Sequence, residues 1–314
     1  MKKAIKYILL VLVVMLTYSV QAQQDPHFTH YMYNMSGVNP AYATDNTGVM
    51  NVGGLYRTQW VGAVGAPKTI SAFVHSPIAK RLEAGVSIVS DQIGGVVKEN
   101  NFYADVAYVI PVSEKAKISF GVKAGATFFD TNFNGFQYSD AAPDPAFATN
   151  INRVFPNVGV GTFFFTDNYY VGLSAPNLLR TKHLERQNAI ATIGVDEIHY
   201  FLTGGYVFNF DSGFKFKPAF MVKSVSGAPT SFDITANALF DNFFELGVGY
   251  RFDDSVSGLV AFNISPSMRI GYSYDYTLTN LGDFNSGTHE IFLLFDLNLS
   301  GLSSKGYDKS PRFF

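Results

Sequence analysis

The sequence contains no cysteine, a single tryptophan and few charged residues, which make up 15% of the chain. Without cysteine, the protein has no disulfide, no thiolate nucleophile, no cysteine-based metal site and no lipoprotein anchor. The formal net charge of −2 gives no basic surface of the kind that binds nucleic acid, so we expect no nucleic-acid partner. Beyond the N-terminus, no apolar run approaches the ~20 residues that a membrane-spanning helix needs.

The first residues have the pattern of a secretory signal peptide. A lysine-rich start is followed by an apolar core over residues 8–16 and by small or short side chains over 20–22. We predict a signal peptide over residues 1–22, a mature chain that begins at Gln23, and export. Because the apolar core is well below the ~20 residues of a membrane-spanning helix, we disfavour its retention as a membrane anchor.

Aromatic residues and glycine are abundant, with 30 Phe, 18 Tyr and 28 Gly. In the stretch 118–128 the even-numbered residues are apolar, whereas the odd-numbered residues are Ser, Gly, Lys, Gly and Thr. The same period of two returns in 232–240, 244–252 and 268–276, and it indicates strands with one apolar face. In a soluble sandwich that face would meet a second sheet. Strands of about ten residues edged with Tyr and Phe instead suit a lipid-facing band about 25 Å tall.

The connections between the predicted strands support closure of the sheet. Tight turns alternate with long stretches such as 131–155, 176–196 and 280–285, which is typical of outer-membrane barrels whose short side faces the periplasm. We predict an all-β fold, a transmembrane antiparallel β-barrel over residues 47–300. Residues 23–46 are predicted as a short periplasmic N-terminal segment and 301–314 as a C-terminal tail, with both termini periplasmic. The predicted strands, about fourteen, are 47–60, 67–76, 82–91, 98–111, 115–130, 156–166, 168–175, 197–209, 213–225, 229–240, 242–253, 255–264, 266–279 and 286–300.

Charged residues in the predicted strands fall on the face opposite the apolar one. A charge on the lipid face near the membrane midplane would cost about 2 to 4 kcal/mol, so we expect these residues to line the lumen. Because both signs occur, the lumen either conducts small solutes or is filled and crossed by neutralising pairs. A passive outer-membrane solute channel is therefore an alternative function. The residues are Lys123, Lys215, Lys217, Lys223, Asp233, Glu245, Arg251, Arg269, Asp275, Glu290 and Asp296.

Few residues are arranged for catalysis. Ser286, His289 and Glu290 are neighbours in sequence, but a hydrolase triad is recognised by its spatial geometry, and the chain has no G-x-S-x-G motif. We consider an outer-membrane hydrolase and disfavour it. The expectation is that the protein is not an enzyme and has no cofactor.

Metal binding has equally little support in the sequence. His27 and His30 are spaced for one helical turn, but no further ligand follows at a zinc-binding interval. Asp140 and Asp144 could contribute to a calcium site, but no regular series of oxygen ligands surrounds them. We interpret His27 and His30 as hydrogen-bonding or surface residues and Asp140 and Asp144 as turn-forming, solvated acids, and we predict no metal site.

Four motifs resemble those of a known family. They are "QQDPHFTHYMYNMSGVNPAYA" (23–43), "YRTQWVGAVGAPKT" (56–69), "PNVGVGTFFFTDNYYVGLSAPNLL" (156–179) and "GYSYDYTLTNLGDFNSGTHEI" (271–291), with a terminal "PRFF". Together they resemble the PorP/SprF family of Bacteroidota outer-membrane proteins linked to the type IX secretion system. Thr44 departs from the glycine that often follows "NPAYA" in that family.

The resemblance implies an integral outer-membrane barrel with one of two roles in type IX secretion. In the first role the barrel is a docking site for the periplasmic ring of the system. In the second it helps the C-terminal domain of a secreted cargo protein, such as a large adhesin, to reach the cell surface and stay there, in some bacteria for gliding. The implied partners are type IX secretion components, the C-terminal domain of cargo and outer-membrane lipid.

The N-terminal segment 23–46 is the first candidate for partner binding, as a periplasmic cap or docking strap. Asn39 and Pro40 predict a turn just before the first strand. Either the aromatic side chains of the segment close the barrel by packing into the mouth of the lumen, or they and the Asp25-Pro26 pair bind a secretion component. The aromatic residues are Phe28, Tyr31, Tyr33 and Tyr42.

The other candidates lie at the connection between the first two predicted strands, 47–60 and 67–76. Trp60 falls at the end of the first strand on the loop side, where an aromatic anchor at the membrane interface is the simplest interpretation. Gly65 and Pro67 belong to "GAPKT", which predicts a tight extracellular turn. That turn is a second place where a partner's chain could bind.

Overall fold

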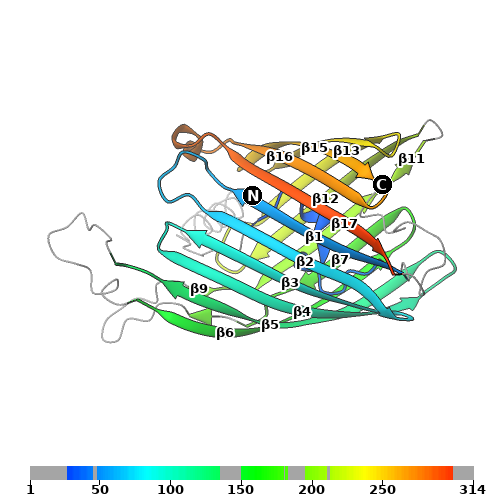
Figure 1. Cartoon of the computed structure of the whole chain (residues 1–314), viewed down its shortest axis with the longest axis horizontal. Helices are drawn as coiled ribbons and strands as arrows, with labels where there is room; N and C mark the ends of the chain where they lie inside the picture. Colours follow the sequence, from blue (N-terminus) through cyan, green and yellow to red (C-terminus); the bar gives the residue numbers. More distant parts are fainter. Residues whose placement is uncertain are drawn as a thin grey trace, which may run out of the picture.

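The protein is a closed barrel of fourteen antiparallel strands in a computed structural model that describes residues 27–44, 48–134, 150–179, 181–182, 195–210 and 213–299 (Figure 1). Consecutive strands are neighbours, and pairing of β1 with β17 and of β10 with β12 completes the ring. The predicted fold class is confirmed. The barrel strands are β1 (Val49–Thr58), β2 (Lys68–Ala79), β3 (Leu82–Ile93), β4 (Val97–Pro111), β5 (Lys117–Thr131), β6 (Asn152–Phe165), β7 (Tyr169–Ala175), β10 (His199–Tyr206), β12 (Phe214–Val225), β13 (Ser231–Phe240), β14 (Phe244–Arg251), β15 (Ser255–Ser265), β16 (Met268–Thr277) and β17 (Thr288–Asn298).

The remaining described elements are short. Strand β11 (Phe208–Asn209) pairs with β12, and β8 (Thr181–Lys182) pairs with β9 (Val195–Asp196) apart from the barrel. Two helical turns, η1 (Tyr31–Tyr33) and α2 (Met35–Val38), lie in the N-terminal segment, and η3 (Asn280–Phe284) lies between β16 and β17. Among the described residues, no helix is long and apolar enough to cross a membrane.

The two ends of the barrel differ in their connections. At the turn end, short turns such as 80–81, 166–168 and 266–267 join the strands. The loop end carries the long connections 59–67, 132–151, 176–198 and 278–287, together with the short ones 94–96, 226–230 and 252–254. In Figure 1 the connection between β16 and β17 lies at the upper left, so the left side is the loop end. Because short turns face the periplasm in outer-membrane barrels, we expect the loop end to face outward from the cell.

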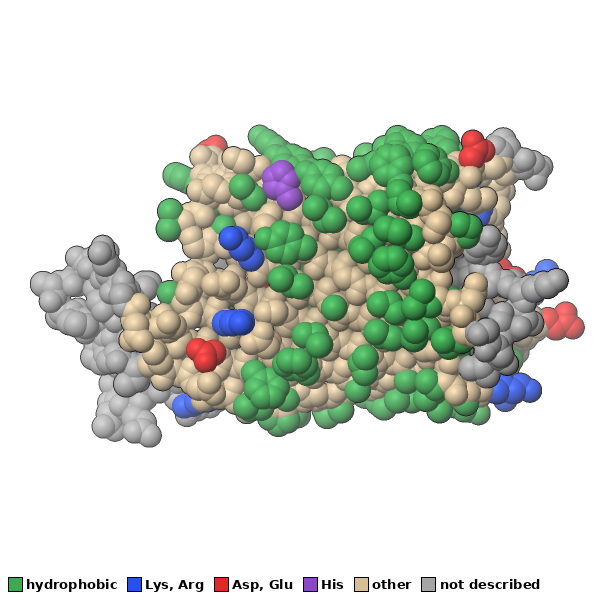
Figure 2. Space-filling model, viewed as in Figure 1, with side chains coloured by type: hydrophobic (Ala, Val, Ile, Leu, Met, Phe, Trp, Pro, Cys, Tyr) green, Lys and Arg blue, Asp and Glu red, His purple; other side chains and the backbone are tan. Residues whose placement is uncertain are grey.

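Apolar side chains cover the outer wall of the barrel. Alternate residues of each strand point outward, and Val122 and Val248 are 61% and 63% exposed. Phe120, Leu246 and Tyr276 follow the same pattern on their strands. Figure 2 shows hydrophobic side chains spread over one face of this wall, with most charged side chains toward the two ends. A wall of this kind is stable against lipid, as the period of two predicted.

The interior of the barrel is filled by the N-terminal segment. Residues 27–44, hereafter the plug, form the dark blue ribbon inside the barrel in Figure 1. Tyr31, Met32, Tyr33, Met35 and Tyr42 are at most 2% exposed and form the main hydrophobic core together with inward-facing strand residues. The described part of the segment therefore lies within the lumen and not on the periplasmic side of the barrel. The even number of strands predicted only the end at which β1 begins. The aromatic side chains that precede β1 are buried because the segment folds into the lumen.

Candidate functional site

A buried cluster of charges near the loop end attaches the plug to the wall. Arg57 Nη1 of β1 donates to Asp275 Oδ2 of β16 at 3.0 Å and to Glu290 Oε2 of β17 at 3.1 Å. The same guanidinium donates to Thr29 Oγ1 of the plug at 3.1 Å. Glu290 accepts hydrogen bonds from the backbone N–H of Thr29 at 3.1 Å and of His30 at 2.8 Å. One cation and two carboxylates thus hold the plug to the wall.

This cluster is almost completely shielded from water. The side chains of Arg57 and Asp275 are 3% and 4% exposed, and that of Glu290 is 0% exposed. Burying ions is expensive unless each is paired and hydrogen-bonded, and here the hydrogen bonds from the plug supply part of that pairing. Without the plug, Glu290 would lose the backbone donors of Thr29 and His30. The wall is therefore built to contain this segment.

A second charged contact lies beside the first, also near the loop end. His27 Nε2 is 3.0 Å from Asp233 Oδ2, and Arg251 Nε donates to the other oxygen of that carboxylate at 3.0 Å. Arg251 also donates to Asp254 at 3.1 Å, in the turn between β14 and β15. The beginning of the plug is thereby tied to the rim of the barrel.

Aromatic packing holds the middle of the plug. The ring of Tyr33 stacks on that of Phe292, with centroids 4.2 Å apart, and its hydroxyl donates to Glu245. Glu245 also accepts from Asn237 Nδ2 at 2.7 Å. The Arg269 guanidinium lies 5.5 Å from the centroid of Tyr33, within the range of a cation–π contact. Charged residues of the lumen therefore surround an aromatic anchor.

The end of the plug lies at the turn end of the barrel. Asn39 Nδ2 donates to the carbonyl of Thr162 at 3.0 Å, and the carbonyl of Ala41 accepts from Ser119 Oγ. Close to the start of β3, Glu83 accepts from the backbone N–H of Thr44 at 2.9 Å. The chain then reaches β1, which starts at the same end. The plug therefore crosses the lumen from the loop end to the turn end.

Glycines in the wall make room for the plug. A Cβ added at Gly121 of β5 would overlap the carbonyl of Pro40, and one added at Gly161 of β6 would overlap the side chain of Asn39. Both glycines point at the same short part of the plug. A glycine inside a strand often marks a place where another part of the backbone approaches closely, and these two positions are of that kind.

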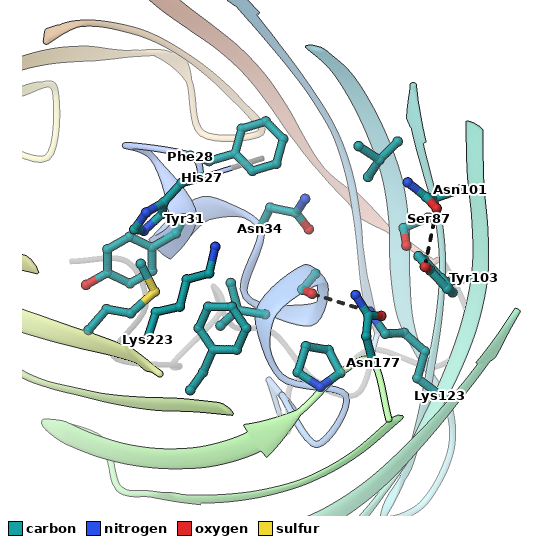
Figure 3. A pocket seen from close by; sticks show the side chains of 16 residues that line it. His27, Phe28, Tyr31, Asn34, Ser87, Asn101, Tyr103, Lys123, Asn177 and Lys223 are labelled. Atoms are coloured by element: carbon teal, nitrogen blue, oxygen red, sulfur yellow. Dashed lines mark hydrogen bonds between the residues drawn. The ribbon is translucent and has the colours of Figure 1, made fainter. Parts of the chain in front are cut away.

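A cavity of about 100 Å³ remains between the plug and the wall. Figure 3 shows the side chains of Lys123 and Lys223 directed toward it from the wall, and Tyr31 and Asn34 from the plug. The described residues that line it include no Asp or Glu. Lys123 Nζ lies 4.4 Å from the centroid of the Tyr103 ring and donates to the carbonyl of Gly37 at 3.4 Å. One of the two lysines thus also helps to hold the plug.

The predicted candidates of the first connection lie at the loop end, apart from the plug. Trp60 has a left-handed backbone with φ of 49°, which is uncommon for a large side chain. Its backbone N–H donates to Thr288 Oγ1 at 3.1 Å. Gly65 has a φ of +76° and its carbonyl accepts from Gly94 N–H at 2.9 Å. The carbonyl of Pro67 accepts from the N–H of Gln59 at 3.0 Å. These residues form an ordered rim to the mouth.

The candidate residues therefore separate into two groups. The first group consists of plug residues inside the lumen, where the structure gives them wall contacts. The second group is the rim. Two candidates, Asp25 and Pro26, lie outside the described residues. The first group is Phe28, Tyr31, Tyr33, Asn39, Pro40 and Tyr42, and the second is Trp60, Gly65 and Pro67.

The residues considered for chemistry are not brought together. His289 Nδ1 is 2.6 Å from the Tyr272 hydroxyl, whereas the neighbouring Glu290 side chain faces the lumen. His27 and His30 contact different carboxylates, those of Asp233 and Glu290. Among the described residues, no group of three His, Asp or Glu side chains is placed to hold a metal ion. Asp140 and Asp144 lie outside the described residues.

Sequence reasoning missed Arg57, the central cation of the cluster. Glu290, Asp275, Glu245 and Asp233 were predicted to line the lumen, and they do so. Arg57 could have been added, because it occupies an inward position of β1 by the same alternation. No feature of the sequence indicated that the plug would supply their hydrogen bonds.

Comparisons with known proteins identify a family for this chain. The family model described as type IX secretion system membrane protein PorP/SprF matches residues 20–295. Among solved structures, Acinetobacter baumannii Omp33 is 9% identical with a TM-score of 0.46, covering 81% of this chain and 99% of its own. The Pseudomonas putida toluene transporter TodX is 9% identical with a TM-score of 0.48, covering 84% and 94%. The search of curated proteins found no match.

Proposed function

From membership in the PorP/SprF family, to which this chain belongs as a type IX secretion outer-membrane component, we propose that the barrel is a binding partner in secretion and not a conduit or an enzyme. Its partner is the C-terminal domain of a secreted cargo protein of the adhesin type, which it helps to reach the surface and to stay attached. Docking of the periplasmic ring of the system is the second branch of the same proposal.

One observation carries the choice of a partner protein over a passive solute channel. The plug crosses the lumen from the loop end to the turn end, and hydrogen bonds of Thr29 and His30 attach it to the buried ion pairs of β1, β16 and β17. A conduit for solutes needs a continuous aqueous path, whereas the described interior holds a tightly packed aromatic segment. A barrel whose lumen is filled can still bind a partner protein through the loops and turns at its two ends.

Affinity purification from the native organism in mild detergent tests this proposal. We expect the tagged barrel to recover the C-terminal domain of a secreted protein or a component of the secretion system. A tagged outer-membrane barrel of another family, purified in the same detergent, is the control. Recovery of neither kind of partner, combined with stable ion conductance of the purified protein, would support the channel instead.

Deletion of the gene separates the two branches. If the barrel serves one cargo protein, its loss removes that protein from the surface while other type IX substrates are still secreted. If it docks the ring, secretion of all type IX substrates fails. Surface labelling of whole cells followed by protein identification distinguishes these two patterns. Gliding, where the organism shows it, is expected to fail in both.

A further inference from the structure

The outer wall of the barrel carries two exposed cations close to its loop end. Lys68 is the first residue of β2, and Lys98 is the second residue of β4. By strand alternation they point to the same side as Ile70 and Phe102, which are 56% and 45% exposed on the outer wall. Gln92 of β3 lies between the two lysines, opposite Lys68 in one strand pairing and opposite Lys98 in the next. Two strand spacings, about 10 Å, therefore separate the lysines.

The ammonium groups of both lysines are open to a ligand. Within the described part of the chain, neither group has an ion-pair or hydrogen-bond partner. The only carboxylate opposite either lysine in the strand registers is that of Asp130, which faces Lys98 and accepts a hydrogen bond from Asn152 Nδ2 at 3.1 Å. The two cations thus outnumber the one acid beside them, and the wall is positive at this place.

The outward side chains become less polar in steps away from the lysines. The next pair along β3 and β4 is Ser90 and Asn100, which stand opposite each other, and Ser90 Oγ donates to Asn100 Oδ1 at 2.8 Å. The pair after that is Ile88 and Phe102, which are 46% and 45% exposed. The chemistry that matches this order is an anionic group, then sugar or amide groups, and then acyl chains.

The cations are confined to one side of the barrel. Figure 2 views the side of β1 to β5 and shows basic side chains toward the loop end, at the left. Lysines that only anchor a barrel at the membrane interface have no reason to gather on one side. On the opposite side, the first outward residues of the strands at the loop end are uncharged in the described chain. They are Tyr200, Ser224, Phe232, Tyr250 and Val256.

We propose that the outward face of β2 to β4 at the loop end, hereafter the basic patch, binds a phosphorylated glycolipid of the outer leaflet. Its phosphate lies between Lys68 and Lys98, because lysine is a point charge on a flexible stem and both ammonium groups can approach one phosphate. Its sugar and amide groups meet Ser90 and Asn100, and its acyl chains follow the apolar wall beyond them. The loop end is the end that we expect to face outward, toward that leaflet. This site is separate from the binding of a secretion partner.

Lipid binding by the purified full-length protein in detergent tests the proposal. Native mass spectrometry of the delipidated barrel would measure the Kd for three probes: lipid A with its phosphates, the same lipid A after removal of the phosphates, and phosphatidylglycerol. The test variant is Lys68→Gln with Lys98→Gln. The control is Lys80→Gln with Lys115→Gln, which removes the same charge from exposed turn-end positions beside β2 and β4. Lys68→Arg with Lys98→Arg keeps the charge and should restore binding.

We expect wild type and control to bind phosphorylated lipid A equally and the test variant to bind it about 30-fold more weakly. Equal affinity of the test variant and the wild type overturns the proposal. Equally tight binding of dephosphorylated lipid A overturns the role of the phosphate, and equally tight binding of phosphatidylglycerol shows a general site for anionic lipid and overturns the glycolipid. Heat-modifiable mobility on gels must show folded barrels. If the double variant does not fold, Lys68→Gln and Lys98→Gln alone, each with an expected loss of about fivefold, give the decision.

Discussion

Arg57 and Glu290 are direct partners across the junction of the first and last barrel strands. They stand opposite each other in the register of β1 and β17, and their side chains form an ion pair of 3.1 Å. The plug binds the same carboxylate through the backbone of Thr29 and His30. The junction that closes the ring and the attachment of the plug therefore depend on one group of side chains.

Replacing Arg57 tests how much this group contributes to stability. Arg57→Met removes the cation and leaves the carboxylates of Asp275 and Glu290 buried without their shared partner. Loss of one member of a buried pair costs about 3 to 5 kcal/mol, so we expect the free energy of unfolding to fall by that amount. Urea unfolding in detergent, followed by the fluorescence of the single tryptophan, measures the change.

Lys115→Met is the matched control for that variant. Lys115 lies exposed in the turn between β4 and β5, where an isolated surface charge contributes little to stability. Its unfolding midpoint is expected to stay within experimental error of the wild type. Equal stability of the Arg57→Met variant and the wild type would show that the cluster does not fasten the barrel.

Deletion of the plug tests whether the lumen is a closed path. Planar bilayers with the wild-type protein should show little ion conductance, because the plug fills the interior. Removal of residues 27–44 should produce discrete conductance steps, provided that heat-modifiable mobility on gels shows a folded barrel. If the deletion variant does not fold, the double variant Tyr33→Ala with Tyr42→Ala replaces it in the conductance measurement, because it removes two large side chains of the plug. Large conductance of the wild type would contradict the packing seen here.

The glycine at position 121 tests the close approach of wall and plug. Gly121→Val places a side chain where the Pro40 carbonyl lies, so the plug backbone has to move. Overpacking of this kind costs about 1 to 3 kcal/mol, and we expect lower stability and faster proteolysis of the plug. Gly258→Val is the control, since a Cβ at Gly258 meets nothing within 4 Å. Similar behaviour of both variants would argue against a tight fit.

The residues once considered for hydrolysis can be tested for activity. His289 contacts Tyr272, and the neighbouring Glu290 side chain points to the other face of the strand. We therefore expect Ser286→Ala and His289→Ala to change neither the hydrolysis of lipids and short esters nor partner recovery. A hydrolytic activity that the purified wild type has and that either variant loses would reopen the question of an enzyme.

The outer rim is where we expect a secreted partner to bind, and Trp60 is its most distinctive side chain. Trp60→Ala should weaken partner binding by about 2 kcal/mol, roughly 30-fold in Kd, if the ring anchors the contact. Phe210→Ala is the control, because Phe210 is a 51% exposed aromatic residue at the turn end. Binding by titration calorimetry compares them. A loss at Phe210 and not at Trp60 would place the partner in the periplasm.

The wall of the barrel could be predicted from the sequence because strand alternation is local. Phe120 and Lys123 reveal their opposite faces through their immediate neighbours, and turns such as that at Asp241 mark the strand ends. The plug could not be placed in this way. Its short helical turns have no period of two, and contacts such as that of Thr29 with Glu290 join residues 261 positions apart. Such pairings depend on the closed ring, which no local pattern encodes.

The junction of β1 and β17 also constrains the order of assembly. The plug is synthesised before any strand, yet its main carboxylate partner belongs to the last strand. The plug can therefore form its full set of contacts only when β17 is in place in the ring. A polypeptide that stops before residue 288 lacks β17, so it has neither the junction of β1 with β17 nor the Glu290 carboxylate that binds the plug. The complete binding site of the N-terminal segment therefore requires the first and the last barrel strand together.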